Sequence, residues 1–140
     1  MAMRVLDISN WQNGINLAAV DMDGVIIKAT QGKHYVSPSC DIQVQQAIRE
    51  GIPWGVYHYI EGDFFVDNCA GYIKHGILCA DWEQGDNGAW GDESYLQRFT
   101  DRVKERTGVI CLKYSSQAVF PWDVCQDSGA WVAQYADNKP

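Results

Sequence analysis

Six apolar, strand-like runs alternate with helical patterns along these 140 residues, and this alternation constrains the fold more than any other feature of the chain. The predicted strands are Arg4–Ser9, Gly24–Thr30, Pro53–Ile60, Gly76–Glu83, Val109–Ser115 and Ala130–Ala136. Strands that alternate with helices are typical of parallel β-α-β units. The length suits a single core, so we expect one α/β domain over residues 1–140.

The three longer connections each carry an apolar stripe at helical spacing, with a capping residue at the start. The predicted helices run from Asp41 to Gly51, from Asp63 to Ile73, and from Asp92 or Ser94 to Gly108. The connection Asn16–Asp23 allows only a short helix, and Gln117–Gly129 contains a proline and is predicted to be irregular.

Two architectures fit this pattern, an open doubly wound sheet and a closed barrel. The glycine-rich phosphate loop of a nucleotide-binding open sheet is missing after the first strand, where Ser9–Gln12 stands instead. Polar and aromatic residues gather at the strand ends, namely Asp7, Lys28, Tyr57, Asp81, Glu83, Tyr114 and Tyr135. Convergence from so many strands favours a modified TIM-like β/α barrel with its site at the carboxyl rim.

Two carboxylates, Asp81 and Glu83, follow the apolar run Gly76–Ala80. Alternate residues of a strand share a face, about 6.6 Å apart along the backbone, so we expect both side chains to point the same way. Their mutual repulsion raises one pKa and gives a protonated acid beside an ionised partner. Such a pair can cleave a glycosidic bond, with Glu83 as general acid and base. Asp81 could be a nucleophile, a water-activating base or the group that steers the N-acetyl group of the substrate, and the backbone spacing does not distinguish retention from inversion.

A metal site built from Asp7, Asp81 and Glu83 is the alternative use of these carboxylates. No histidine stands beside them in the sequence, so we expect no metal and no cofactor. A metal-dependent hydrolase on the same barrel stays open as a less favoured hypothesis.

Charge and hydropathy exclude several classes of function. The net charge of −7 and the lack of a basic stripe argue against nucleic acid and against an anionic membrane surface. No apolar stretch is long enough to span a bilayer, and the region Met1–Ser9 lacks the pattern of a secretory signal. The five cysteines form no C-x-x-C pair, so we expect them to be core residues of a protein made in a reducing cytoplasm.

Five segments in register resemble glycoside hydrolase family 25, the lysozyme-type muramidases of bacteria and their phages. They are Asp7–Gln12, Val25–Gly32, Gly51–Tyr59, Asp81–Glu83 and Trp131–Tyr135. The resemblance covers nearly the whole chain. It implies hydrolysis of the β-1,4 bond between N-acetylmuramic acid and N-acetylglucosamine in peptidoglycan, with net retention and participation of the substrate acetamido group.

The resemblance assigns Glu83 as the catalytic acid and Asp81 and Asp7 as supporting carboxylates. Aromatic faces near the strand ends are predicted to stack on sugar rings, with Trp131 as the preferred platform. The predicted substrate-binding residues are Tyr57, Tyr114, Trp131, Gln134, Tyr135, Lys28 and Trp11. Lys28 has a second interpretation, as an ion-pair partner of Asp7, and Trp82 is expected to pack against a helix.

Two departures from the family pattern affect these expectations. Gln31 stands where the family usually has a glutamate, which is expected to change the pH dependence. The chain stops at Pro140, where family members continue into further strands that close the barrel.

The leading functional hypothesis is the catalytic module of a phage endolysin that acts on bacterial peptidoglycan. It would be held in the host cytoplasm before its release to the cell wall. The alternative is a non-catalytic glycan-binding module on the same fold. The sequence predicts no oligomeric state.

Overall fold

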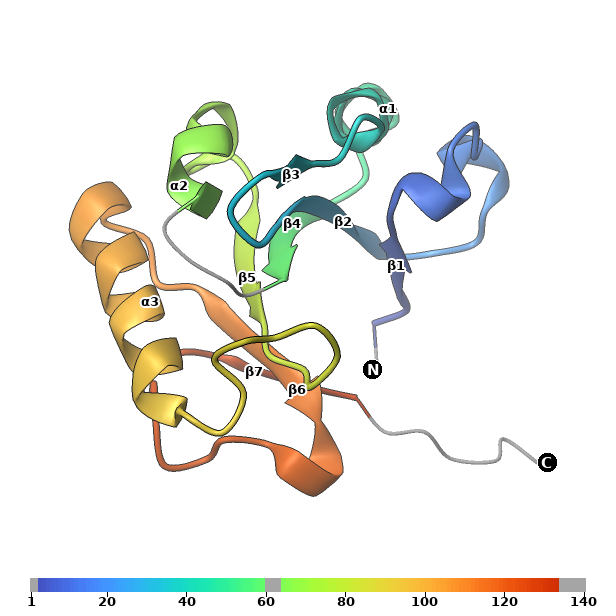
Figure 1. The fold of residues 1–140 in the computed structure, drawn as a ribbon. Helices are drawn as coiled ribbons and strands as arrows, with labels where there is room; N and C mark the ends of the chain where they lie inside the picture. The colour runs from blue at the N-terminus through green and yellow to red at the C-terminus, as the bar shows by residue number, and fades with distance from the viewer. Residues whose placement is uncertain (1–2, 60–63, 134–140) are drawn as a thin grey trace, which may run out of the picture.

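The structure is a computed structural model, and it describes residues 3–59 and 64–133. Its centre is a sheet with the order β1-β2-β4-β5-β6-β7, and all neighbours along this path are parallel. The strands are β1 (Val5–Ile8), β2 (Gly24–Gln31), β4 (Trp54–Tyr59), β5 (Ile77–Asp81), β6 (Leu112–Ser116) and β7 (Ala130–Ala133). The sheet curls into a half-barrel with β1 and β7 at its two edges (Figure 1). The predicted α/β class and the barrel-like curvature are confirmed.

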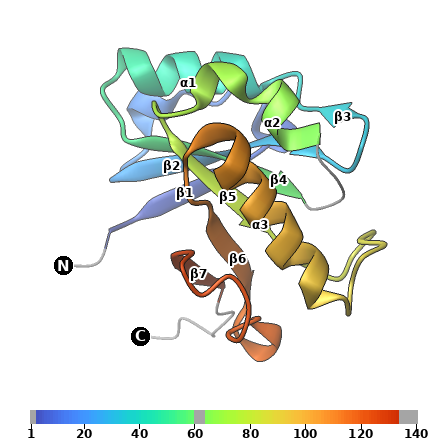
Figure 2. The ribbon, with the colours of Figure 1, turned by 90° about the vertical axis from the view of Figure 1, so that its left-hand side faces the viewer.

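Helices cover the convex side of this sheet (Figures 1 and 2). They are α1 (Cys40–Arg49), α2 (Phe64–Asn68) and α3 (Glu93–Thr107), with short 3-10 turns at Asn10–Gln12, Leu17–Ala19, Ala70–Tyr72 and Gln117–Val119. The core lies between the sheet and the helices. Val25, Ile27, Val56 and Leu78 fill it from the strands, and Val44, Leu96, Phe99 and Val103 fill it from the helices.

Helix boundaries differ from the prediction at two places. Ser39, and not Asp41, stands at the N-cap of α1, and Asp41 lies in its first turn. The segment predicted to run from Asp63 to Ile73 divides into α2 and a 3-10 turn, and Asp63 itself lies outside the described residues. An apolar stripe shows which face of a segment is buried, but it does not show where the backbone leaves the α conformation.

One predicted strand needed correction, and one strand was not predicted. Pairing of β6 with β5 begins at Leu112, opposite Cys79, so Val109–Cys111 precede the strand and do not belong to it. The two-residue strand β3 (Tyr35–Val36) lies antiparallel to β2 and was not predicted. A strand of two residues carries no hydrophobic period that a sequence pattern could reveal.

The five cysteines are buried and unpaired, as expected of core residues. Burial raises the pKa of the Cys40 thiol to about 11 and that of Cys111 to about 12, so both stay protonated and unreactive at neutral pH. Within the described part of the chain, no helix is long and apolar enough to cross a lipid bilayer.

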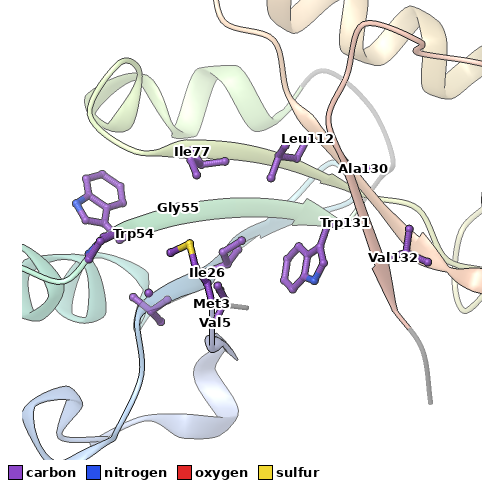
Figure 3. Close-up of a pocket in the computed structure, with 13 residues that line it drawn as sticks. Met3, Val5, Ile26, Trp54, Gly55, Ile77, Leu112, Ala130, Trp131 and Val132 are labelled. Atoms are coloured by element: carbon purple, nitrogen blue, oxygen red, sulfur yellow. The ribbon is translucent and has the colours of Figure 1, made fainter. Parts of the chain in front are cut away.

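An apolar hollow of about 340 Å³ opens on the concave face, at the amino ends of the strands. Figure 3 shows the side chains of Ile26, Ile77, Leu112 and Trp131 around this space. No titratable side chain lines it among the described residues. The hollow therefore lies below the carboxyl rim, where the predicted catalytic residues stand.

Candidate active site

One row of side chains crosses the concave face near the carboxyl ends of the strands. The strand register places five residues opposite one another across β2, β4, β5, β6 and β7, namely Gln31, Tyr59, Asp81, Tyr114 and Trp131. A small pocket beside this row is lined by Asp7, Tyr57, Cys79, Asp81, Tyr114 and Trp131. Residues far apart in the sequence thus meet at one place, as expected for a barrel site.

Asp81 is the most buried carboxylate of this row. Its exposed fraction is 7%, and its Oδ1 atom has no hydrogen-bond partner among the described residues. Burial raises the pKa of Asp81 to about 8, and the negative charges of Glu83 and Asp7 add to this rise while Lys28 opposes it. Asp81 therefore holds a proton at neutral pH in the free site.

Glu83 follows β5 and is half-buried. Partial burial raises its pKa, as does the charge of Asp7, and Lys28 again acts in the opposite direction. The backbone around it is anchored, because Trp82 N donates to the Tyr114 carbonyl (2.9 Å) and Asn87 Nδ2 donates to the Glu83 carbonyl (3.0 Å).

The predicted distribution of protons in this pair needs a correction. The sequence assigned the proton to Glu83 and the charge to Asp81, whereas the larger rise in pKa belongs to Asp81. The reason is burial, which strand parity does not report. Asp81 still lies inside the strand, while Glu83 lies two residues beyond it and is more accessible.

Asp7 projects from β1 into the same site. The Tyr57 hydroxyl donates a hydrogen bond to its carboxylate, and this bond lowers the pKa of Asp7, as does the charge of Lys28. Loss of hydration among the surrounding groups outweighs both effects and raises the pKa of Asp7. Tyr57 is thereby held against a carboxylate. Burial first, and then the charges of Asp7 and Asp81, raise the pKa of Tyr57 far above its ordinary value.

Lys28 is the cation of this site, and a β-bulge determines what it contacts. Lys28 pairs with Tyr57 and Thr30 pairs with His58, so Ala29 is an extra residue in β2. The extra residue inverts the alternation of faces, so Lys28 and Gln31 point to the same side. The Lys28 ammonium donates to Gln31 Oε1 at 2.5 Å.

The ammonium of Lys28 also lies near two aromatic rings. It is 5.4 Å from the ring centre of Tyr59 and 5.9 Å from that of Tyr35 on β3. Burial lowers the pKa of Lys28, while Asp81, Asp7 and Glu83 raise it. Gln31 and Tyr59 thus belong to the site. The sequence singled out Gln31 only as a departure from the family pattern, and it did not single out Tyr59. Tyr59 shares strand parity with Tyr57, and that signal could have identified it.

The predicted sugar platforms are not all in the same place. Trp131 and Tyr114 pack edge to face with ring centres 4.7 Å apart, and both rings are half-buried at the row. Trp11 is 88% exposed on the turn after β1. Trp82 is 1% exposed with its ring 5.6 Å from that of Trp90, as expected of a packing residue. The predicted contacts of Gln134 and Tyr135 lie outside the described residues.

A curled parallel sheet with acidic side chains at its carboxyl rim defines a protein of the α/β-barrel class. A family model described as Glycosyl hydrolases family 25 matches residues 6–140, and the chain belongs to this family. The resemblance to glycoside hydrolase family 25 that the sequence showed is therefore confirmed as family membership.

Two curated relatives, a lysozyme and a muramidase, are similar to this chain in sequence at 27–28% identity. Lysozyme M1 of Streptomyces globisporus is 27% identical over 95% of this chain, which spans 51% of that protein's length. The N,O-diacetylmuramidase of Chalaropsis sp is 28% identical over 90% of this chain and 71% of its own length. The chain therefore spans only about half of the first of these relatives.

Solved structures share the fold. A muramidase from Trichobolus zukalii superposes with a TM-score of 0.79 at 23% identity, over 98% of this chain and 79% of that one. The catalytic domain of the endolysin ply40 from bacteriophage P40 of Listeria monocytogenes gives a TM-score of 0.75 at 25% identity, over 99% of this chain and 77% of that one.

Proposed function

We propose that this chain hydrolyses the β-1,4 bond between N-acetylmuramic acid and N-acetylglucosamine in peptidoglycan. The observation that carries the proposal is the group of three carboxylates, Asp7, Asp81 and Glu83, at the carboxyl rim of the sheet. Burial raises the pKa of all three, the charges of Glu83 and Asp7 raise that of Asp81 further, and the charge of Asp7 raises that of Glu83. Membership of family 25 and the muramidase relatives support the same substrate class.

In this proposal Glu83 donates its proton to the glycosidic oxygen while the bond from that oxygen to the anomeric carbon breaks. The acetamido oxygen of the substrate attacks the anomeric carbon and forms a cyclic cation. Glu83 then takes a proton from water as the water opens this ring, and the configuration is retained. Glu83 is more accessible than Asp81, which lies two residues before it at the end of β5. This exposure suits proton exchange with substrate and water.

Asp81 orients the acetamido group in the same scheme. The free site holds a proton on Asp81. A hydrogen bond from the acetamido N–H to this carboxylate favours its ionised form, and the proton of the pair then resides on Glu83. The ionised Asp81 stabilises the positive charge that develops on the acetamido group, with Asp7 and Tyr57 supporting it from β1 and β4.

Substrate contacts are assigned to the aromatic residues of the rim. Trp131 and Tyr114 form the main sugar platform, Tyr57 and Lys28 contact the polar groups of the sugar, and Trp11 offers an exposed face at the edge of β1. Gln134 and Tyr135 remain proposed contacts on the strength of the sequence. No cofactor, nucleic acid or membrane takes part in the proposed reaction.

We assign the chain a role in cell-wall lysis as the catalytic module of a phage endolysin, residing in the host cytoplasm until it reaches the wall. The likeness to the catalytic domain of the phage P40 endolysin supports this assignment. Residues 1–140 are taken as one catalytic domain.

The test is an analysis of the new chain ends that the protein produces. Purified Gram-positive peptidoglycan is digested, reduced with borohydride and hydrolysed, and the reduced amino sugars are identified by mass spectrometry. We expect reduced muramic acid, in equal amount with and without EDTA. Reduced glucosamine, or activity that EDTA abolishes, would contradict the proposal. Pelleting of the protein with the peptidoglycan without new ends would identify a glycan-binding module.

A further inference from the structure

The contacts of Lys28 are unusual for a cation that faces three carboxylates. The ion pairs among the described residues all lie elsewhere on the molecule, and none includes Lys28. Its hydrogen bond goes to the neutral amide oxygen of Gln31. The aromatic rings of Tyr35 and Tyr59 hold the ammonium by cation–π contact.

We propose that Gln31 is a positioning residue, whose amide oxygen holds the Lys28 ammonium apart from the carboxylates of Asp7, Asp81 and Glu83. The role in turnover rests on the proposed function. The arrangement itself is a property of the bulged strand β2.

The bulge at Ala29 is what makes this contact possible. In a regular strand, residues three apart point to opposite faces, so Gln31 would turn away from Lys28. The extra residue brings both side chains to the concave face, where Lys28 pairs with Tyr57 and Gln31 pairs with Tyr59. The bulge is fixed on its other side, because Ser37 N donates to the Ala29 carbonyl at 2.8 Å.

Tyr59 fixes the opposite wall of the Lys28 position. Its hydroxyl donates to the Gly85 carbonyl in the loop that follows Glu83, so the ring cannot swing away from the ammonium without losing this bond. Gln31, Tyr59 and Gly85 thereby connect β2, β4 and the loop after β5 around one cation.

The other charged or titratable groups around Lys28 come from each neighbouring element. Asp7 stands on β1, Tyr35 on β3, Tyr57 on β4, and Asp81 and Glu83 at the end of β5. On the convex face, His58 is buried between aromatic rings, and its pKa is lowered to about 3 by burial and by the charge of Lys28. Burial and the charges of Asp81, Glu83 and Asp86, the last of which lies in the loop after β5, raise the pKa of Tyr59 to about 12.

The chemistry of residue 31 determines how strongly the ammonium acts on these carboxylates. A neutral acceptor binds Lys28 and leaves its positive charge in place. A carboxylate at this position would neutralise that charge and add a negative one beside the site. An apolar side chain would release the long lysine side chain, which could then form an ion pair with Asp81 or Glu83.

Relative to the wild-type amide, a carboxylate and an apolar side chain at residue 31 should shift the carboxylate pKa values of the site in opposite directions. In Gln31→Glu the pKa values of Asp81 and Glu83 should rise by about 0.5–1 unit, because a compensating cation is neutralised. In Gln31→Met they should fall by a similar amount, because the released ammonium approaches a carboxylate. A merely structural role of Gln31 would change stability but would not give shifts of opposite sign.

The experiment is a carbon-13 NMR titration of the side-chain carboxyl groups in the wild type and both variants. Gln126→Glu, an exposed change of the same charge on the loop before β7, is the matched control and should leave the midpoints of Asp81 and Glu83 unchanged. Asp81→Asn and Glu83→Gln assign the two signals. Shifts of the same sign in both Gln31 variants, or midpoints equal to those of the wild type, would overturn the proposal.

The rate of peptidoglycan cleavage as a function of pH tests the effect of the same variants on turnover. Both limbs of the rate profile should move to higher pH in Gln31→Glu and to lower pH in Gln31→Met. A wild type that titrates as described but does not cut peptidoglycan would refute the proposed function and leave the positioning role intact. Opposite titration shifts with unmoved rate profiles would refute a part for Gln31 in turnover.

Discussion

The two ends of the concave face are built from opposite chemistry. At the amino ends of the strands, apolar side chains surround a hollow of about 340 Å³. At the carboxyl ends, three carboxylates and a lysine share one small region. Both ends belong to the same strands, and only Ile27 separates Ile26 from Lys28 on β2. The polar end is therefore a local feature, which the shared fold does not by itself require.

A second contrast shows that burial alone does not explain the polar end. Lys113 is 3% exposed on the convex face of β6, and its ammonium donates to the carbonyls of Pro121 (2.9 Å) and Val124 (2.6 Å). Asp81 is similarly buried on the neighbouring strand, yet one of its oxygens has no partner. Burial alone therefore does not determine whether a polar side chain of this sheet has a hydrogen-bond partner.

The largest effect is expected when charge is moved to the apolar end. Ile26→Asp places a carboxylate among side chains that offer no partner, and we expect the free energy of unfolding to fall by about 4 kcal/mol at pH 8. Urea unfolding followed by circular dichroism measures this change. Ile26→Val is the control, with a loss of about 1 kcal/mol. Similar losses for both variants would show that the two ends do not differ as described.

A smaller effect is expected when charge is removed from the polar end. The pKa of Asp81 is about 8 in the folded chain against 3.8 for an ordinary aspartate, so the folded state binds this proton more tightly. Stability therefore falls as pH rises from about 4 to about 8. Asp81→Asn removes this loss and should stabilise the protein by about 2 kcal/mol at pH 8, since the amide still leaves a polar group buried.

Urea unfolding between pH 4 and pH 8 tests this prediction, because the advantage of Asp81→Asn should disappear at the acidic end. Asp127→Asn is the control of opposite sign. Asp127 pairs with Lys104 on the surface, which lowers the pKa of Asp127, so its stabilising contribution exists above pH 4 and is lost as pH falls. An Asp81→Asn variant that is destabilised at every pH would contradict the account.

The smallest effect concerns the aromatic platform where the two ends meet. Trp131 lines both the apolar hollow and the pocket at the carboxylates. We expect Trp131→Ala to weaken binding of soluble peptidoglycan fragments by about 1 kcal/mol, or about fivefold in Kd by calorimetry. Trp122→Ala removes a 60% exposed ring outside this row and should leave the affinity unchanged. Equal losses in both variants would argue against a sugar platform at Trp131.

Much of this architecture was predictable because the long strands carry strong periodic patterns. A strand is present in each of the six predicted segments, and Gly108 ends α3 in the left-handed conformation that glycine favours. Glu83 lies near enough to Asp81 for its charge to raise the pKa of Asp81, although it stands beyond the strand to which the parity argument applies. These features depend on residues close together in the sequence, where steric rules act directly.

The rest depends on long-range packing that a pattern does not contain. The bulge at Ala29 turns Gln31 to the same face of the sheet as Lys28, and no residue type in β2 predicts this bulge. The proton on Asp81 depends on how deeply the sheet and the rim bury it, together with charges from β1 and β2. The family resemblance indicated that Gln31 was unusual, but it did not indicate that Gln31 contacts Lys28.

The central claim is that Glu83 moves the protons of glycosidic cleavage, and the most direct measurement is the initial rate of muramidase activity in Glu83→Gln. We expect this variant to fold like the wild type and to lose about 10³-fold or more in turnover. Glu105→Gln changes a 69% exposed carboxylate on α3 in the same way and should keep the wild-type rate. A Glu83→Gln protein that retains a substantial part of that rate would contradict the account.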